Sequence, residues 1–205
     1  IAPVKRQKKH GRPITEFFLM PSFLSGLVAA ALGYCVMTFL MTATPLQVVD
    51  ASRLSHEANA RIIQWHVVAM FAPSLFSGVL ISKFGVGKIL WAGLACYVIA
   101  SVIALSGTGF YIYLGALIFL GIGWNFLYVG GSSVIANSAN LEERGRVQGV
   151  ADFCIFSVVA MASMLSGMAH SELGWVVMMI IAFAPIFFIA VALTIGKPKL
   201  TNQAA

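Results

Sequence analysis

The sequence predicts an all-α membrane protein, a bundle of six transmembrane helices. The first observation is the composition, because 60% of the 205 residues are hydrophobic and 10% are charged, whereas a soluble domain carries about 25% charged residues. The second is a series of six apolar runs, each near the length of about 20 residues that crosses a bilayer as a helix. These runs do not alternate polar and apolar residues as barrel strands do, and helices satisfy their own backbone groups in lipid.

Short polar or charged segments separate the six runs and set each boundary in turn. The first run follows a basic tail and ends at Pro45, and the polar stretch 50–60 separates it from the second. A basic, glycine-rich loop precedes the third run, the aromatic residues of 110–113 open the fourth, the charged stretch 142–149 precedes the fifth, and Trp175 opens the sixth. The predicted spans are residues 23–46, 62–82, 89–106, 110–136, 149–169 and 174–195.

The same boundaries give the expected organisation of the chain. We predict a basic cytoplasmic tail over residues 1–22, a six-helix transmembrane domain over 23–195 and a C-terminal cytoplasmic tail over 196–205. Six spans of about 20 residues leave about 85 residues outside the bilayer, too few for a soluble catalytic domain. The chain begins with Ile1 rather than Met, and its basic start has no apolar h-region, so we expect a piece of a longer chain rather than a signal peptide.

Basic residues are distributed unequally between the two sides of the predicted bundle. The formal net charge is +6, and by the positive-inside rule the side that holds most Lys and Arg is cytoplasmic. We therefore predict an integral, multi-pass protein of the inner or plasma membrane with both termini in the cytoplasm. The opposite side keeps only Arg53 and Arg61, whereas the predicted cytoplasmic side holds Lys5, Arg6, Lys8, Lys9, Arg12, Lys83, Lys88, Arg144, Arg146, Lys197 and Lys199.

Polar and aromatic side chains inside the spans are the candidate lining of a solute cavity. Each polar group costs free energy in hydrocarbon unless it faces a partner or a water-filled space. The alternatives are a proline-bent packing face in the first span, a satisfied interfacial histidine in the second, and hydrogen bonds between helices in the fourth. The candidates are Tyr34, Thr38 and Met41 in the first span, His66 in the second, and Trp124, Asn125, Tyr128 and Ser132 in the fourth.

Asp152 is the one carboxylate that falls inside a predicted span. Because the fifth span is expected to begin at Gly149, Asp152 lies in its first turn, where the helix dipole favours an anion. A role in ion coupling is the second interpretation of the same residue.

Two predicted cytoplasmic loops combine glycine with basic residues. Taken alone, each is a tight charged turn that follows the positive-inside rule. The loop between the second and third spans holds Gly78, Ser82, Lys83, Gly85 and Lys88, and the loop between the fourth and fifth holds Arg144, Gly145 and Gly149.

With these residues in view, nearly the whole chain resembles the C-terminal six-helix half of a major facilitator superfamily transporter. The signature loop of that family has Gly, an acid, a basic residue, Gly and further basic residues, and the loop 78–88 follows it except that Ser82 stands at the acidic position. Because serine has no charge, the resemblance does not imply an ion pair at Ser82. The spacing of Arg144, Gly145 and Gly149 is also similar, as are the runs 41–46, 64–73 and 123–126.

The resemblance implies a fold, a function and partners. The six spans would be helices seven to twelve of a secondary transporter that moves a small solute by alternating access, as an exporter or symporter driven by an ion gradient. The implied partners are the lipid bilayer, the solute and an N-terminal six-helix half or a second copy, without nucleic acid or cofactor. Carried onto this sequence, the best solute-side candidates are Tyr34, Met41, Asn125 and Tyr128.

Three alternatives to transport make different demands on the sequence. A rhomboid-type protease needs a Gly-x-Ser-Gly setting and a histidine on the sixth span, but Ser133 occupies the second glycine position and the sixth span has no histidine. A metal site is not predicted, because no Cys or His pair has ligand spacing. A truncated or self-associating six-helix fragment with a structural or regulatory role stays open, since small residues such as Ala162 and Ser166 suit helix association.

Overall fold

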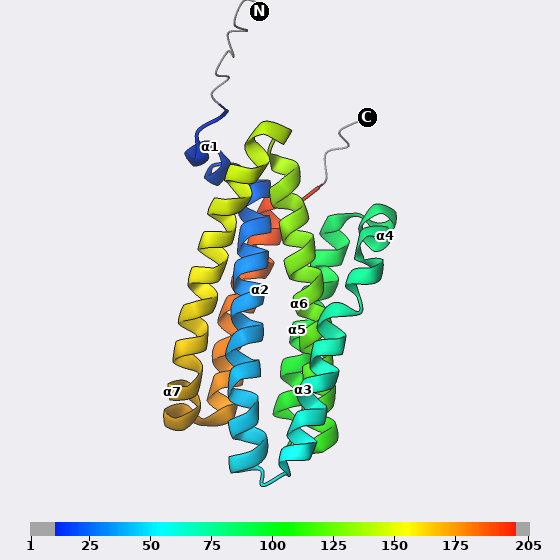
Figure 1. Ribbon diagram of the computed structural model, residues 1–205, viewed down its shortest axis with the longest axis vertical. Helices are drawn as coiled ribbons and strands as arrows, with labels where there is room; N and C mark the ends of the chain where they lie inside the picture. Colours follow the sequence, from blue (N-terminus) through cyan, green and yellow to red (C-terminus); the bar gives the residue numbers. More distant parts are fainter. Residues whose placement is uncertain (1–10, 200–205) are drawn as a thin grey trace, which may run out of the picture.

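The computed structural model describes residues 11–199, and within them every regular element is a helix (Figure 1). This confirms the predicted all-α class. The elements are α1 (Ile14–Phe18), α2 (Pro21–Pro45), the π-helix η1 (Leu46–Ala51), α3 (His56–Phe71), α4 (Ser74–Phe84), α5 (Val86–Leu105), α6 (Phe110–Ser138) and α7 (Leu141–Gly196).

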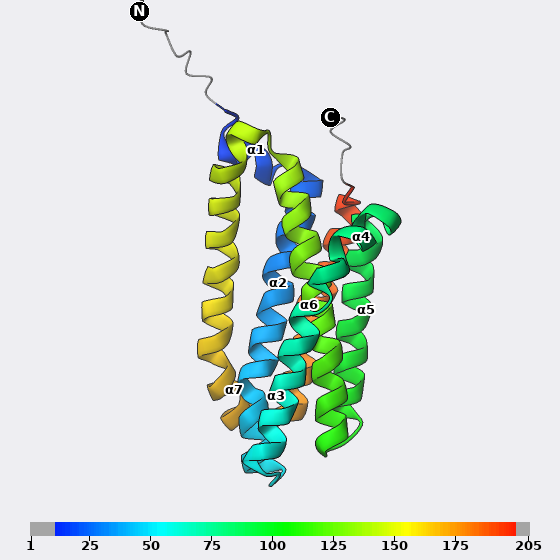
Figure 2. The same cartoon turned by 45° about the vertical axis from the view of Figure 1, so that its right-hand side comes forward.

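The described residues cross the length of the bundle six times, as the apolar runs predict. Four helices are long and apolar enough to cross a membrane, and α3 with α4 forms a fifth crossing bent by 41°. The 56-residue α7 contains two crossings, because its backbone breaks at Gly174 with φ 75° and ψ 170°. Its first arm (residues 141–173) and second arm (175–196) run antiparallel, drawn yellow and orange in Figures 1 and 2.

Helices α2 and α6 form the centre of the bundle. Helix α2 packs on α6 and α7, while α6 also packs on α3 and α5. Glycines permit the close approach, since a Cβ on Gly131 would lie 2.5 Å from the Gly26 carbonyl oxygen and a Cβ on Gly123 2.5 Å from Cδ1 of Tyr97. Lipid offers no hydrophobic drive between helices, so contacts of this kind carry the association.

The two ends of the bundle differ in charge. Both described chain ends, the α4–α5 junction and the α6–α7 turn lie at one end, uppermost in Figure 1. The α2–α3 junction, the α5–α6 junction and the break at Gly174 lie at the other end. The upper end holds Arg12, Lys83, Lys88, Arg144, Arg146, Lys197 and Lys199, whereas Arg53 and Arg61 lie at the lower end; Lys5, Arg6, Lys8 and Lys9 fall outside the described residues.

Several helix ends differ from the predicted boundaries, each for a local reason. The first span runs on through η1 to Ala51, and α3 begins at His56 because the Ser55 hydroxyl accepts a hydrogen bond from the Ala58 amide at 3.1 Å. The expected loop 47–61 is therefore reduced to residues 52–55. At the N-terminus, the expected tail contains α1 and the first two residues of α2.

The fifth span also begins earlier than predicted. Asn140 and Glu143 form a reciprocal capping box that starts α7 at Leu141. Asp152 thus lies about three turns into the helix, and the prediction that it occupies the first turn is wrong. Its carboxylate instead accepts a hydrogen bond of 2.8 Å from the Gln148 amide.

We expect Gly131→Ala to destabilise the protein, because the added Cβ would meet the Gly26 carbonyl oxygen at 2.5 Å. Overpacking a core costs about 1–3 kcal/mol, which lowers the melting temperature of the full-length protein in detergent, measured by scanning fluorimetry. Gly149→Ala is the matched control, since its Cβ meets nothing within 4 Å in the described part of the chain. Equal melting temperatures for the two variants would contradict the close α2–α6 contact.

Candidate functional site

Aromatic side chains from four crossings meet in one cluster, which we call the aromatic corner. The rings of Trp124 and Tyr128 on α6 are stacked, with centroids 5.3 Å apart and an interplanar angle of 8°. The Tyr34 ring on α2 meets both of them edge-on, at 5.2 and 5.4 Å. Phe71 of α3 lies 5.8 Å from Trp124, and Phe156 of α7 lies 5.9 Å from Tyr34. Offset and edge-to-face pairs at these distances are the favourable aromatic geometries.

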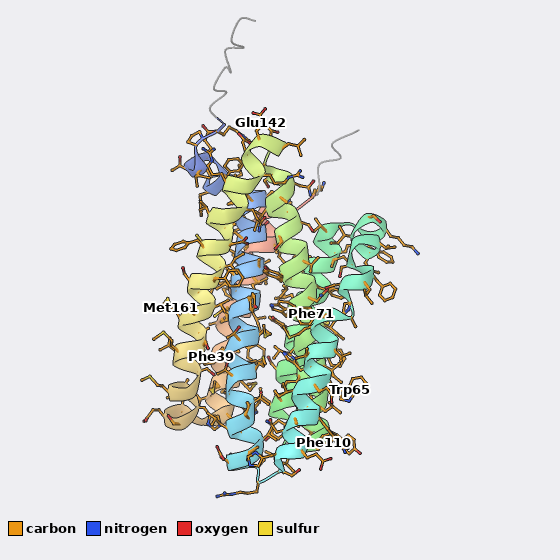
Figure 3. The ribbon with its side chains drawn as sticks, viewed as in Figure 1. Phe39, Trp65, Phe71, Phe110, Glu142 and Met161 are labelled. Carbon is orange, nitrogen blue, oxygen red and sulfur yellow. The ribbon has the colours of Figure 1, made fainter. Side chains whose placement is uncertain are left out.

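The aromatic corner passes from a buried centre to an open surface. Trp124 is 5% exposed, whereas Phe71 and Phe156 at the two edges are 57% and 49% exposed. Figure 3 places Phe71 at mid-height of the bundle. The cluster therefore offers flat apolar ring surfaces, near the depth of the bilayer centre, to whatever occupies that open face.

Two polar atoms on the same helix are left without partners. Nε1 of Trp124 and Oγ of Ser132 are buried and accept or donate no hydrogen bond within residues 11–199. A buried unpaired polar group costs free energy, so a hydrogen-bonding partner for either atom would stabilise this part of α6. The two residues are eight positions apart on α6, about 12 Å along the axis, with Tyr128 between them.

The remaining predicted cavity residues do not all join the aromatic corner. Thr38 and Met41 follow Tyr34 at successive turns of α2 and are half-buried. His66 is fully buried between α3 and α6, where its Nδ1 lies 2.7 Å from the Leu117 carbonyl oxygen. Asn125 turns toward α3 and α4, and its amide bonds to residues of those two helices. Tyr34, Trp124 and Tyr128 are thus the predicted residues that the fold brings together.

The glycine-rich loop between the second and third crossings is a tight turn without an ion pair among the described residues. Gly85 has φ 85°, a conformation that favours glycine. The Ser82 hydroxyl donates to the Val79 carbonyl at 2.9 Å, and the Lys83 ammonium lies 5.4 Å from the Phe84 ring centroid. Gly78 has open space where a Cβ would stand, and Lys88 is exposed.

The loop between the fourth and fifth crossings closes the end of α6. The Arg144 guanidinium donates from Nε to the Ala136 carbonyl at 3.1 Å, which satisfies one of the last carbonyl groups of that helix. Gly145 and Gly149 meet nothing within 4 Å of an added Cβ in the described residues, so close packing does not explain either glycine.

A second polar cluster joins the segment before α1 to the α6–α7 turn, and we call it the N-terminal clamp. The Arg12 backbone amide donates to Oε1 of Glu143 at 2.7 Å. In the Arg12 side chain, Nη2 donates to Oε2 of Glu143 at 2.9 Å. The same Nη2 also donates to the Ser138 carbonyl at 3.0 Å, and Arg146 donates to the Arg12 carbonyl. The Arg12 guanidinium further lies 4.5 Å from the Phe17 ring centroid.

The N-terminal clamp lies in the charged turn, before the apolar part of α7 begins. The Glu143 side chain is 5% exposed, and hydrogen bonds from the Arg12 side chain and backbone lower the pKa of its carboxyl from 4.5 to about 2. Sequence reasoning missed this cluster, although the Asn140-x-x-Glu143 spacing is a readable helix-start signal.

We expect Glu143→Gln to release α1, because the neutral amide loses the charge-assisted bonds to Arg12. A nitroxide attached at Glu16→Cys should then become more mobile by electron paramagnetic resonance, whereas Glu142→Gln, an exposed neighbour labelled in Figure 3, should leave it unchanged. Since the folded pKa is depressed, the clamp is intact above about pH 4.5 and weakens as the pH falls toward 2. Unchanged label mobility in Glu143→Gln would refute the clamp.

Comparison with known proteins gives three relatives and no matching family profile. The riboflavin transporter RfnT of Brucella anthropi is 40% identical over 190 residues, which are 92% of this chain and 48% of RfnT. The uncharacterized MFS-type transporters YdeG and YddS of Bacillus subtilis are 33% identical over 147 residues and 32% identical over 151. Those matches cover 70% and 72% of this chain and 34% of each transporter. The chain thus spans about half the length of RfnT and a third of the other two.

Proposed function

Because this chain belongs to the major facilitator superfamily and corresponds to one half of such a transporter, we propose that it is the C-terminal half of a secondary transporter that moves a small solute by alternating access. Its relatives are membrane transporters rather than enzymes, in agreement with the prediction that the chain is not an enzyme. The partner in this proposal is an N-terminal six-helix half, which fits the length of RfnT relative to the matched segment. A second copy of the chain is the alternative partner.

The aromatic corner is the observation that carries the choice of solute. A stacked Trp124–Tyr128 pair with the Tyr34 ring edge-on suits a flat conjugated ring system. Riboflavin has such a tricyclic ring, with carbonyl acceptors at one edge and a hydroxylated chain. RfnT carries riboflavin in its name, so we propose riboflavin or a closely related flavin as the solute of this chain.

The two unpaired polar atoms, on Trp124 and Ser132, are the proposed partners for polar groups of the same solute. Nε1 of Trp124 is a donor that suits a ring carbonyl, and Oγ of Ser132 suits a hydroxyl of the chain. Satisfying both atoms in the bound state gives the solute an advantage over a purely apolar molecule of the same shape. Thr38 and Met41 continue the proposed solute-facing side of α2 at successive turns after Tyr34, whereas His66 bonds to the Leu117 carbonyl between α3 and α6.

The charge pattern supports an orientation in the membrane, and one carboxylate supports a coupling residue. The basic end of the bundle is the cytoplasmic end in this proposal, so both termini lie in the cytoplasm of a cell with an inner or plasma membrane. Asp152 lies one turn from Phe156 on the same helix and is half-buried. It is the proposed coupling residue of this half for a flux driven by an ion gradient, as an exporter or a symporter.

We expect a membrane-impermeant maleimide added to intact cells to label Arg53→Cys and to label Lys88→Cys only after the membrane is opened. Both side chains are exposed, and they lie at opposite ends of the bundle. Each substitution is made in the full-length protein with Cys35, Cys96 and Cys154 replaced by serine. Labelling of Lys88→Cys from outside would reverse the proposed orientation.

We expect Tyr128→Leu to weaken riboflavin transport by the full-length protein in proteoliposomes. Loss of one stacking ring costs about 1–3 kcal/mol, or about 5- to 150-fold in affinity, so KM should rise. Phe187→Leu on the second arm of α7 is the matched control, because this exposed aromatic residue lies outside the aromatic corner and its loss should leave KM unchanged.

Two results would overturn the proposal in different ways. If Tyr128→Leu and Phe187→Leu give the same KM, the aromatic corner does not bind the solute. If the wild-type full-length protein shows no flux of riboflavin under any imposed ion gradient, the solute is wrong. A stable homodimer of the 205-residue chain without flux would favour the self-associating fragment instead.

A further inference from the structure

The second crossing is broken in its middle. Helix α3 ends at Phe71, α4 begins at Ser74, and their axes differ by 41°. Pro73 causes the break, because it has no N–H to donate to the carbonyl four residues earlier and its ring crowds that turn. In hydrocarbon the freed carbonyl groups need other donors.

Asn125 of α6 supplies the hydrogen bonds at this break. Its Nδ2 donates to the Met70 carbonyl at 2.7 Å and to the Ser74 hydroxyl at 2.5 Å. Its Oδ1 accepts from the Ser77 hydroxyl at 2.8 Å. In an unbroken helix the Met70 carbonyl would accept from the Ser74 amide. The fully buried Asn125 side chain therefore bonds to both sides of the break.

Helix α4 packs little of its surface against the other helices, since Ser77 and Ile81 are its buried residues. Leu75, Phe76 and Val79 are 79%, 62% and 65% exposed, and α4 lies at the outer right-hand edge of the bundle in Figure 1. Its far end meets a second break at Gly85, with φ 85°. The 11-residue helix thus lies between two points where the backbone changes direction.

The aromatic corner and the break share neighbouring residues. Trp124 belongs to the aromatic corner and the next residue, Asn125, holds the break. Phe71 is the last residue of α3 before the break, and its ring lies 5.8 Å from that of Trp124. A solute that shifts either ring therefore acts directly on the residues that fix the position of α4.

We propose that α4 is a mobile arm that pivots at Ala72–Pro73, and that Asn125 is the positioning residue that holds the arm in its bent state. The use of this motion in solute transport rests on the proposed function, whereas the pivot itself does not. The arm is 11 residues, about 16 Å, long. Straightening the 41° bend would displace its far end by about 11 Å.

The pivot is measured as a distance in the full-length protein in lipid nanodiscs. Nitroxides are attached at Ser82→Cys, near the far end of α4, and at Glu142→Cys, at the start of α7; both positions are exposed. Pulsed electron paramagnetic resonance then reports the distance distribution between them. We expect Asn125→Ala to broaden or shift this distribution by up to about 11 Å. Asn125→Asp keeps the shape but replaces the two N–H donors with at most one O–H donor, and we expect it to act in the same direction.

Asn137→Ala is the matched control on the same helix. Its amide donates to the Ser133 carbonyl within α6 at 2.8 Å, so its removal should leave the distance unchanged. Pro73→Ala restores the missing N–H, and we expect it to straighten the crossing. In that background Asn125→Ala should have no further effect, because a continuous helix no longer needs the added donor.

Three outcomes would overturn the proposal. These are an unchanged distance in both Asn125→Ala and Asn125→Asp, a change of equal size in Asn137→Ala, or a full additive effect of Asn125→Ala in the Pro73→Ala background. Transport gives a separate readout, since Asn125→Ala should lower the maximal rate about fivefold with KM little changed. If the full-length protein transports no solute tested, the distance measurement still decides the pivot.

Discussion

The need to satisfy backbone hydrogen bonds inside hydrocarbon is the constraint on which this structure depends. A regular helix meets that need by itself, so each departure from regular helix requires an added partner. At the break beside Pro73, the Asn125 amide donates to the Met70 carbonyl. At the end of α6, the Arg144 guanidinium donates to the Ala136 carbonyl. A polar pair of side chains also lies beside the irregular π-helix η1 at the other end of the bundle, where the Gln47 amide donates to the Tyr113 hydroxyl at 2.9 Å. Irregular backbone and polar side chains therefore occur together along the chain.

Close packing of small residues sets where the aromatic corner forms. The Gly26–Gly131 contact brings α2 against α6, and the same approach brings Tyr34 within reach of Trp124 and Tyr128. Bulky residues at the glycine positions would separate the two helices and disperse the rings. The stability of the centre and the geometry of the candidate site thus have one cause.

The sequence predicts the crossings well because their signal is local, namely the length of an apolar run between charged or aromatic boundaries. It predicts contacts between helices poorly. The ring of Phe156 meets that of Tyr34, and the ring of Phe71 meets that of Trp124, and only the fold shows these pairs between different helices. His66 and Asn125 have the polar chemistry of cavity residues, yet their partners are the Leu117 and Met70 carbonyls. The start of α7 is an intermediate case. The capping box of Asn140 and Glu143 is a local signal, but the apolar run that begins at Gly149 is a stronger one and sets the predicted boundary.

In the proposed transporter, the N-terminal clamp sets the point at which a linker from an N-terminal half would attach. Arg12 is bonded through both its backbone and its side chain to Glu143, so a segment that arrives from upstream is fixed at the α6–α7 turn before it reaches α2. In the proposed two-half transporter, the linker between the halves would therefore end at Arg12 rather than at Pro21. A shorter linker raises the effective concentration of one half around the other, and the clamp would place the attachment point beside the fourth and fifth crossings.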